Sequence, residues 1–76
     1  MKDSLGELIK QELERQERSI TWFASKVGVD RSNVYRLFKK HSLDTSLLMR
    51  ISIVLNYDFF AYLSQEMKDR QNLQQK

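Results

Sequence analysis

The sequence contains no cysteine, no proline and one histidine among its 76 residues. Without cysteine, neither a disulfide framework nor a thiolate metal site can stabilise the fold. Because His41 is the only histidine, a histidine cluster that would hold a metal is excluded as well. We therefore expect packing of leucine, aromatic and aliphatic side chains to stabilise the chain, and we expect no metal, no other cofactor and no small-molecule ligand.

Long hydrophobic runs are also missing. The longest apolar runs are only a few residues, and no hydrophobic stretch follows a basic start at the N-terminus. We therefore expect neither membrane insertion nor secretion, and we expect the protein in the cytoplasm. A chain of 76 residues holds one small core, which leaves no room for a second, catalytic domain. Its 41% hydrophobic and 30% charged residues indicate a globular domain rather than a disordered tail.

Acidic residues are scarce in the middle of the chain. Residues 1–17 carry three basic and five acidic side chains, and residues 51–76 carry three of each. Residues 18–50 carry seven basic against two acidic side chains, so this segment alone has a net charge of +5. A basic centre is the electrostatic footprint of a polyanion partner, although a run of charges is also typical of an ordinary solvated face.

Apolar side chains recur at the three- and four-residue spacing of amphipathic helices, and no strand-like alternation is found. The predicted helices cover about residues 4–17, Ser19 or Thr21 to Val27, Arg31 to about Lys39, Asp44 to Asn56, and Asp58 onward. Gly28 follows the second helix, where a left-handed backbone is cheapest for glycine. The prediction is an all-α domain of five short helices around one core.

Residues with side-chain oxygens precede the helices and can cap them. Either Ser19 or Thr21 can cap the second helix. Asp30 is the natural cap of the third, because its carboxylate can accept the amides of Ser32 or Asn33. The fourth helix is expected to bury Leu47, Leu48, Ile51, Val54 and Leu55.

The C-terminal part of the chain becomes polar. Phe59, Phe60, Leu63 and, at the end, Met67 are expected to complete the core from the fifth helix. Beyond Ser64 the sequence is glutamine-rich, so residues 69–76 are either a fraying helix end or disordered. We accordingly divide the chain into a domain at residues 1–66 and a polar extension at residues 67–76.

Residues 20–39 have the core spacing of two short helices joined by a tight turn. Two such helices cross closely only if the residue at their contact is small, and Ala24 lies one turn before Gly28 on the inner face. The surrounding apolar contacts come from Phe23, Val27, Val29, Val34 and Leu37. This combination resembles the bacterial helix-turn-helix. With one helix before it and two after it, the chain resembles the lambda-repressor-like, Cro-type family over roughly Leu5 to Leu63.

The resemblance implies that the helix from Arg31 to Lys39 enters the major groove of double-stranded DNA. Helical geometry turns Val34, Leu37 and Phe38 inward and leaves Arg31, Ser32, Tyr35, Arg36 and Lys39 outside, with Asn33 at the margin. Arg31, Ser32 and Arg36 match the family's base-reading positions, where an arginine can donate two hydrogen bonds to guanine. Alternatively, the two arginines contact only phosphate. Asn33 and Tyr35 complete the candidate base-reading set, although the ring of Tyr35 could equally contact phosphate or cover apolar surface.

The start of the second helix is the first of two candidate phosphate contacts. Ser19, Thr21 and the amides beside them match the family's phosphate-clamping element. The family often has glutamine early in this helix, whereas this chain has Ile20, Thr21 and Trp22. The indole N–H of Trp22 either reaches a phosphate or the ring packs against the first helix.

The second candidate phosphate contact follows the recognition helix. Lys39 and Lys40 lie where basic side chains approach the sugar-phosphate backbone and add salt-dependent affinity. Lys40 and the neighbouring His41 are alternatively ordinary loop residues.

The function implied by the resemblance is sequence-specific DNA binding by a transcription regulator. One recognition helix touches only a few base pairs, so we expect a homodimer on adjacent half-sites. The expected contact surface is the fifth helix and the tail, with Phe59, Phe60, Tyr62, Met67 and Leu73 available. Each of these side chains could instead complete the core of the monomer.

Two other classes of function were weighed. A protein-interaction module on the same scaffold would neutralise a toxin or dock on a transcription complex, and an exposed apolar patch near residues 57–67 would favour it. An enzyme is not expected, because the chain has no cysteine, one histidine and no glycine loop that cradles phosphate. The glutamates Glu12, Glu14 and Glu17 are interpreted as a solvated helix face.

Overall fold

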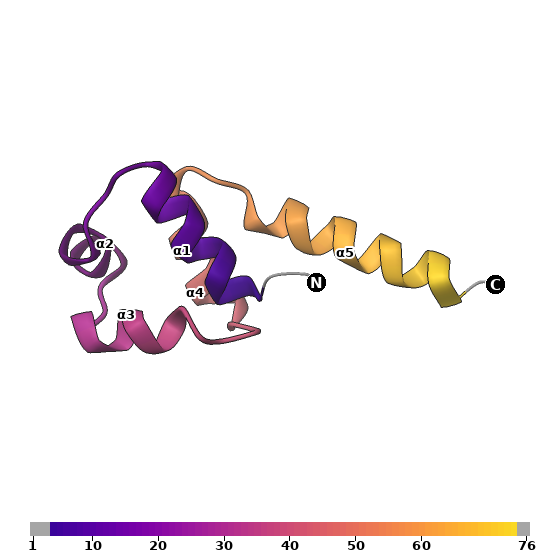
Figure 1. Cartoon of the computed structure of the whole chain (residues 1–76), viewed down its shortest axis with the longest axis horizontal. Coiled ribbons are helices and arrows are strands. Elements are labelled where there is room, and N and C mark those ends of the chain that lie inside the picture. The colour runs from indigo at the N-terminus through magenta and orange to yellow at the C-terminus, as the bar shows by residue number, and fades with distance from the viewer. Residues whose placement is uncertain (1–3, 75–76) are drawn as a thin grey trace.

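Five α-helices and no strand make up residues 4–74, the part of the chain that the computed structural model describes. They are α1 (Leu5–Arg15), α2 (Ile20–Val27), α3 (Arg31–Leu37), α4 (Thr45–Leu55) and α5 (Phe59–Gln74) (Figure 1). The all-α prediction is confirmed, although α1 ends at Arg15 and α3 ends at Leu37 instead of Lys39. Within residues 4–74, no helix has both the length and the apolar character needed to cross a membrane.

Side chains cap the N-termini of four of the helices. The Glu7 amide donates to Ser4 Oγ (3.3 Å), and the Trp22 amide donates to Ser19 Oγ (3.0 Å). In the same way, the Leu47 amide donates to Asp44 Oδ1 (2.8 Å), and the Ala61 amide donates to Asp58 Oδ1 (3.0 Å). Each bond satisfies one of the amides that a first helical turn leaves without an intrahelical partner. Of the two candidates for the cap of α2, Ser19 is therefore the one used.

The start of α3 differs from the other four. The Asp30 carbonyl accepts hydrogen bonds from the amides of Asn33 (3.0 Å) and Val34 (3.2 Å). The Asp30 carboxylate makes no capping bond, so the prediction that it accepts the amide of Ser32 or Asn33 is wrong. The carbonyl already takes the single proton of the Asn33 amide, which leaves the carboxylate exposed and facing solvent.

Left-handed residues follow three of the helices. Gly28 (φ 84°) follows α2 as predicted, and Asn56 (φ 51°) ends α4 at the predicted residue, although its left-handed backbone was not predicted. Glu17 (φ 57°) adopts the same conformation after α1, and the next amide, that of Arg18, donates to the Leu13 carbonyl (3.2 Å). This is the usual closure of a helix by a left-handed residue, but a side chain with a Cβ is strained there.

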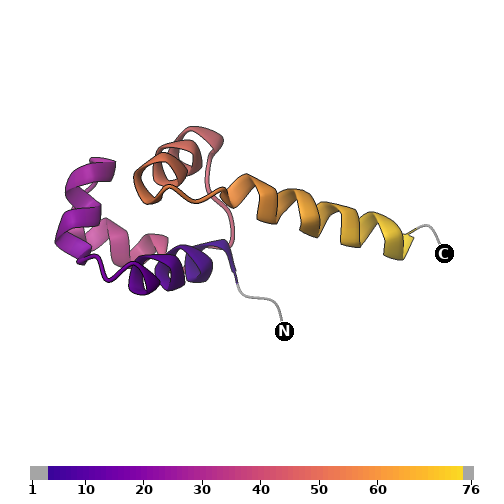
Figure 2. The same cartoon turned by 90° about the horizontal axis from the view of Figure 1, so that it is seen from above.

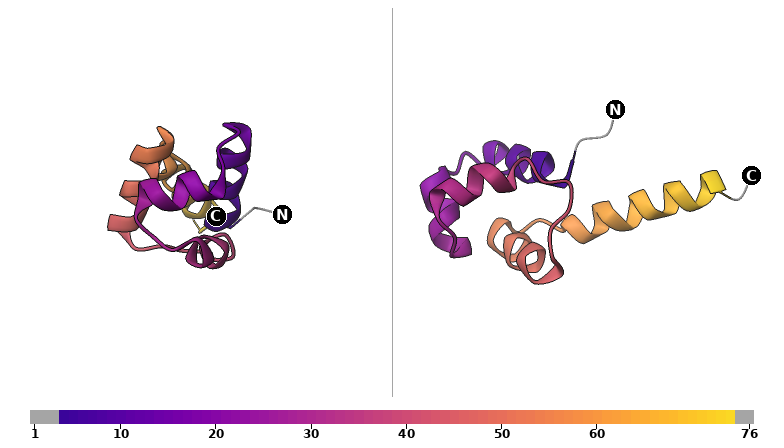
Figure 3. Two further views of the ribbon diagram at one scale, coloured as in Figure 1. Left: turned by 90° about the vertical axis from the view of Figure 1, so that its left-hand side faces the viewer. Right: turned by 90° about the horizontal axis from the view of Figure 1, so that it is seen from below.

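The core lies between α1, α2, α3, α4 and the first residue of α5. Its buried side chains are Leu5, Ile9, Leu13, Phe23, Ala24, Val27, Val34, Leu37, Phe38, Leu48, Ile51, Leu55 and Phe59. Leu47 and Val54, which were expected to be buried, are half-buried and pack against this cluster. Figure 3 shows α2 across one end of the globule, with α1 and α4 on either side of it.

Helix α5 projects away from the other four helices, as Figures 1 and 2 both show. The molecule is accordingly elongated, with extents of 46 × 22 × 20 Å. Phe59 is buried, but Phe60 is 36% exposed and Met67 is 51% exposed, so the prediction that these two side chains complete the core is wrong. Of the described side chains of α5, only Phe59 belongs to the buried core.

The polar C-terminal extension is helical as far as Gln74. Of the two predictions for residues 69–76, the structure gives a helix for 69–74, and residues 75 and 76 lie outside the described part. The side chain of Leu73, one of the candidates for a dimer contact, is also outside what the structure describes.

One glutamate of α1 is buried, contrary to the solvated face expected for Glu12, Glu14 and Glu17. Glu12 is 7% exposed, whereas the other two are exposed as predicted. Arg15 Nε donates to Glu12 Oε1 (3.0 Å), and Gln16 Nε2 donates both to Glu12 Oε2 (2.7 Å) and to the Leu55 carbonyl (2.7 Å). Hydrogen bonds from Arg15 lower the pKa of Glu12, while its burial opposes that shift. The network joins the C-terminal ends of α1 and α4.

Candidate nucleic-acid interface

The turn between α2 and α3 fixes the relation of these two helices. The amides of Gly28 (2.9 Å) and Val29 (3.1 Å) both donate to the carbonyl of Ala24. Ala24 itself is 6% exposed, and its small side chain allows the helices to approach closely at this point. The ring of Phe23 stacks on that of Phe38 at 6.5 Å between centroids, which ties α2 to the end of α3. The predicted pair of short helices joined by a tight turn is therefore present.

Arg50 of α4 holds the end of α2. Its Nη1 donates to the carbonyl of Val27 at 3.0 Å, at a helix terminus where a positive charge is favourable. Arg50 was counted from the sequence among the basic residues that would attract a polyanion. In the structure its guanidinium keeps this charge and also donates to α2, so it positions the end of that helix.

Helix α3 has one buried face and one open face. Val34 (0% exposed) and Leu37 (4% exposed) anchor it in the core, followed by Phe38 (8% exposed). All five candidate base-reading residues are exposed: Arg31, Ser32, Asn33, Tyr35 and Arg36. At 100° per residue, Ser32 lies furthest from the buried pair, Val34 and Leu37.

The other candidates on α3 lie on its two flanks. Asn33 and Arg36 line a hollow of 330 Å³ together with Lys40, against the apolar side chains of Val29, Leu37, Leu43 and Leu47. Arg31 and Tyr35 lie on the opposite flank of the helix, and Tyr35 is 48% exposed. The structure thus brings Asn33, Arg36 and Lys40 together and separates them from Arg31 and Tyr35.

The start of α2 presents donors to solvent. The first intrahelical bond of α2 is donated by Phe23 to the Ser19 carbonyl (3.1 Å), so the amides of Ile20 and Thr21 precede the helical ladder. Both Ser19 and Thr21, the two candidate phosphate ligands here, are exposed. Such a helix start suits an anion, because its amides and dipole both favour negative charge.

Trp22 packs against the core rather than standing free. Its ring is half-buried and contacts the buried cluster, which favours the packing interpretation over an indole contact to phosphate. The guanidinium carbon of Arg18 lies 4.4 Å from the centroid of this ring. A cation is therefore held beside the start of α2. Arg18 was not among the predicted phosphate contacts, although its four-residue spacing to Trp22 was a signal for it.

Gly6 sets the position of the end of α3, and it too was not predicted. Its amide donates to the Lys40 carbonyl at 2.9 Å. A Cβ at Gly6 would lie 2.3 Å from the Leu37 carbonyl oxygen and 2.7 Å from the Phe38 carbonyl carbon. The first turn of α1 therefore rests directly on the backbone where α3 ends, a contact that needs a residue without a side chain.

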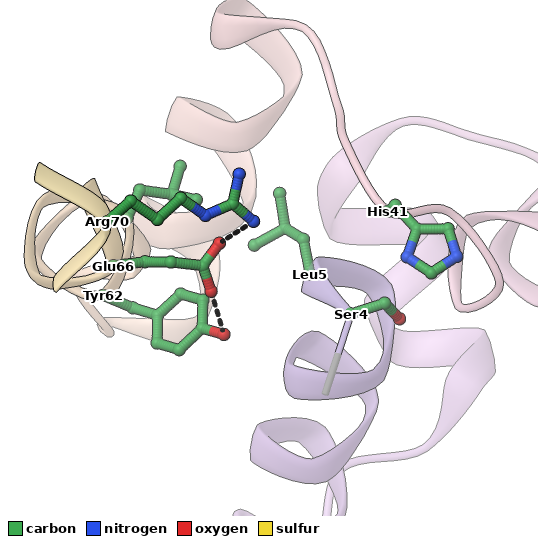
Figure 4. Close-up of a pocket in the computed structure, with 7 residues that line it drawn as sticks. Ser4, Leu5, His41, Tyr62, Glu66 and Arg70 are labelled. Carbon is green, nitrogen blue, oxygen red and sulfur yellow. Dashed lines mark hydrogen bonds and ion pairs between the residues drawn. The ribbon is translucent and has the colours of Figure 1, made fainter. Parts of the chain in front are cut away.

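Lys39, Lys40 and His41, which follow α3, do not share one surface. Lys39 and Lys40 are exposed, and Lys40 lines the hollow beside Arg36. His41 instead lines a cleft of 190 Å³ together with Ser4, Leu5, Tyr62, Leu63, Glu66 and Arg70. Figure 4 shows His41 across this cleft from Glu66, which accepts hydrogen bonds from Tyr62 (2.9 Å) and Arg70 (3.3 Å). His41 therefore does not extend the basic surface of α3.

Most exposed side chains of α3 and of the start of α2 can donate hydrogen bonds, which suit phosphate oxygens and base edges, whereas the exposed carboxylate of Asp30 can only accept them. Among residues 4–74, no three histidine, cysteine, aspartate or glutamate side chains lie close enough together to hold a metal ion. No family model, no curated protein and no solved structure matches the chain.

Proposed function

We propose that the chain binds double-stranded DNA sequence-specifically as a transcription regulator in the cytoplasm, with α3 in the major groove. The main support is the exposure of Arg31, Ser32 and Arg36 on a helix whose opposite face is fixed in the core by Val34 and Leu37. The major groove is about 12 Å wide, which matches the diameter of an α-helix with its side chains. A rigidly held helix with two exposed arginines has the shape and the donors that base reading needs.

The proposed contacts divide into two kinds. Five exposed side chains of α3 read base edges: Ser32 opposite the buried face, Asn33 and Arg36 on one flank, and Arg31 and Tyr35 on the other. Lys39 and Lys40 contact phosphate beyond the end of α3. Ser19 and Thr21 contact phosphate at the start of α2, where Arg18 adds a positive charge. The net charge of +5 on residues 18–50 supplies the salt-dependent part of the affinity.

The test begins with selection of bound sequences from a random duplex library. The selected duplex is then titrated at several salt concentrations with the wild type, Arg36→Ala and a matched control, Lys10→Ala. The control substitution removes the same charge from an exposed position of α1 that is not among the proposed contacts. Loss of a bidentate contact to guanine is worth about 1–3 kcal/mol. Arg36→Ala should therefore weaken binding roughly 5- to 150-fold, and the control should leave it unchanged.

The two kinds of contact differ in how the affinity depends on the DNA sequence and on the salt concentration. Arg36→Ala should relax the preference at one base pair, whereas Lys39→Ala should weaken all sequences alike and reduce the salt slope by about one. Affinity that is independent of salt, together with no effect of Arg36→Ala, would exclude DNA binding through α3.

A second candidate function is a protein-interaction module on this scaffold, which neutralises a toxin or docks on a transcription complex. It is favoured by the exposed apolar side chains of Tyr57 (43% exposed), Phe60 and Met67. The DNA titration separates the two candidates, because this function requires no affinity for duplex DNA.

A further inference from the structure

The large exposed hydrophobic side chains gather on one surface. Apart from Tyr35 on α3, those of the described chain are Met49 (53% exposed), Ile53 (74%), Tyr57 (43%), Phe60 (36%) and Met67 (51%). We call these five side chains the α4–α5 patch. Two of them, Met49 and Ile53, belong to α4 and were not among the residues expected at a contact surface.

The patch covers the junction of the two helices and a further position on α5. Met49, Ile53, Tyr57 and Phe60 line one open hollow of 450 Å³, and Met67 lines a second hollow on α5 with Leu63. Phe60 and Met67 are seven residues apart and therefore lie on the same face of α5. The ring of Tyr57 lies 4.7 Å from that of the buried Phe59, which fixes the centre of the patch to the core.

The size of the patch matches one side of a homodimer interface. With roughly 200 Å² for each fully exposed large side chain, the five side chains leave on the order of 500 Å² open to solvent. A homodimer interface of standard size buries about 800 Å² per copy, of which about 65%, or about 520 Å², is apolar.

The charge around the patch suits a second copy of the same chain. Helix α5 carries Glu66 and Asp69 against Lys68 and Arg70, a net charge of zero, so two copies of it do not repel each other. An acidic partner would instead be drawn to the basic segment of residues 18–50. Because α5 is 16 residues long, about 24 Å, and projects from the globule, a second α5 has room to lie along it.

We propose that two copies of the chain associate through their α4–α5 patches about a two-fold axis, the same surface being used on both copies. The need for a second copy rests on the proposed function, whereas the choice of surface rests on the exposed side chains. Phe59 takes no part because it is buried in the monomer, and Tyr62 is half-buried and bonded to Glu66.

The test is sedimentation equilibrium of the full chain without DNA. Ile53→Glu and Met49→Glu place a charge in the patch at positions that are already exposed, so both variants should keep the helical circular dichroism of the wild type. Tyr35→Glu is the matched control, because Tyr35 is the large exposed hydrophobic residue outside the patch. We expect a wild-type dimer, a dissociation constant raised at least 100-fold by either patch variant, and an unchanged constant for the control.

Three results would overturn this assignment. They are a wild type that stays monomeric up to millimolar concentration, a dimer whose constant changes less than threefold in either patch variant, and a dimer weakened equally by Tyr35→Glu. A monomeric wild type would favour binding of a different protein at the patch, as in the second candidate function. A dimer with no affinity for DNA would contradict only the proposed function, and a monomer that binds a single half-site would contradict only the proposed association.

Discussion

The contact between Gly6 and the end of α3 predicts that Gly6→Ala strongly destabilises the fold. The new Cβ would lie 2.3 Å from the Leu37 carbonyl oxygen and 2.7 Å from both the carbonyl carbon and oxygen of Phe38. All three neighbours are backbone atoms, so no change of rotamer relieves the overlap. Reaching the 3.4 Å of ordinary contact requires α1 to move from α3 by 3.4 − 2.3 = 1.1 Å.

The size of the effect follows from that movement. Overpacking of this kind costs about 1–3 kcal/mol and occasionally more. A shift of 1.1 Å also breaks the 2.9 Å bond from the Gly6 amide to the Lys40 carbonyl, which adds about 0.5–1.5 kcal/mol. The higher helix propensity of alanine offsets about 1 kcal/mol. We therefore expect a net loss of about 0.5–3.5 kcal/mol, out of the roughly 4–11 kcal/mol that a chain of this length has.

The measurement is urea and thermal unfolding followed by circular dichroism. The expected loss corresponds to a fall in Tm of roughly 2–28 °C. Ser64→Ala, at an exposed position of α5, measures the propensity effect without a packing change. Gly28→Ala gives a useful contrast, because its Cβ would meet only Arg50 Nη1 at an ordinary 4.0 Å and the positive φ of 84° would oppose the substitution. A Gly6→Ala variant as stable as the wild type would refute the close approach of α1 to α3.

Three further substitutions follow from the helix ends and the buried network. Glu17→Gly should raise the free energy of unfolding by about 0.5–1 kcal/mol, because glycine adopts the positive φ of 57° without strain. A lower free energy of unfolding, measured in urea, would contradict this. Ser19→Ala should lower the free energy of unfolding by about 1 kcal/mol through loss of the cap on α2, whereas Thr21→Ala should change it by less than about 0.5 kcal/mol. Equal effects of the two substitutions would contradict the assignment of Ser19 as the cap. Because Arg15 lowers the pKa of Glu12 below its usual 4.5, the unfolded chain binds this proton more readily than the folded one. The stability that the Glu12 carboxylate contributes is therefore complete above pH 4.5 and is lost as the pH falls through the lower folded value, so wild type and Glu12→Gln should differ more at pH 7 than at pH 3 in urea unfolding.

Most features that local sequence determines were predictable, whereas the carboxylate cap expected from Asp30 is absent and the left-handed backbone of Glu17 was not predicted. Gly28 and Asn56 end helices because a left-handed backbone suits these residue types, and Asp44 and Asp58 cap helices through their own carboxylates. The buried and exposed faces of α3 followed from helical spacing around Val34, which is completely buried. Each of these features depends on residues within one or two turns of each other.

The features that depend on distant parts of the chain were not predictable. The close approach at Gly6 depends on where α3 ends, and the burial of Glu12 depends on Gln16 reaching the Leu55 carbonyl. The exposure of Phe60 depends on the direction in which α5 leaves the globule, which the spacing of apolar residues does not encode. In the candidate interface, the same limit applies to Arg50, whose role at the end of α2 appears only in three dimensions.

The reach of α5 has a hydrodynamic consequence. The Cα radius of gyration is 13.4 Å, whereas a compact chain of this length has about 11.4 Å. Gel filtration separates by frictional size, so even a monomer of 9.1 kDa should elute ahead of spherical standards of equal mass. The elution volume therefore reports how far α5 extends, and the number of chains in solution is read from sedimentation equilibrium, which depends on mass and not on shape.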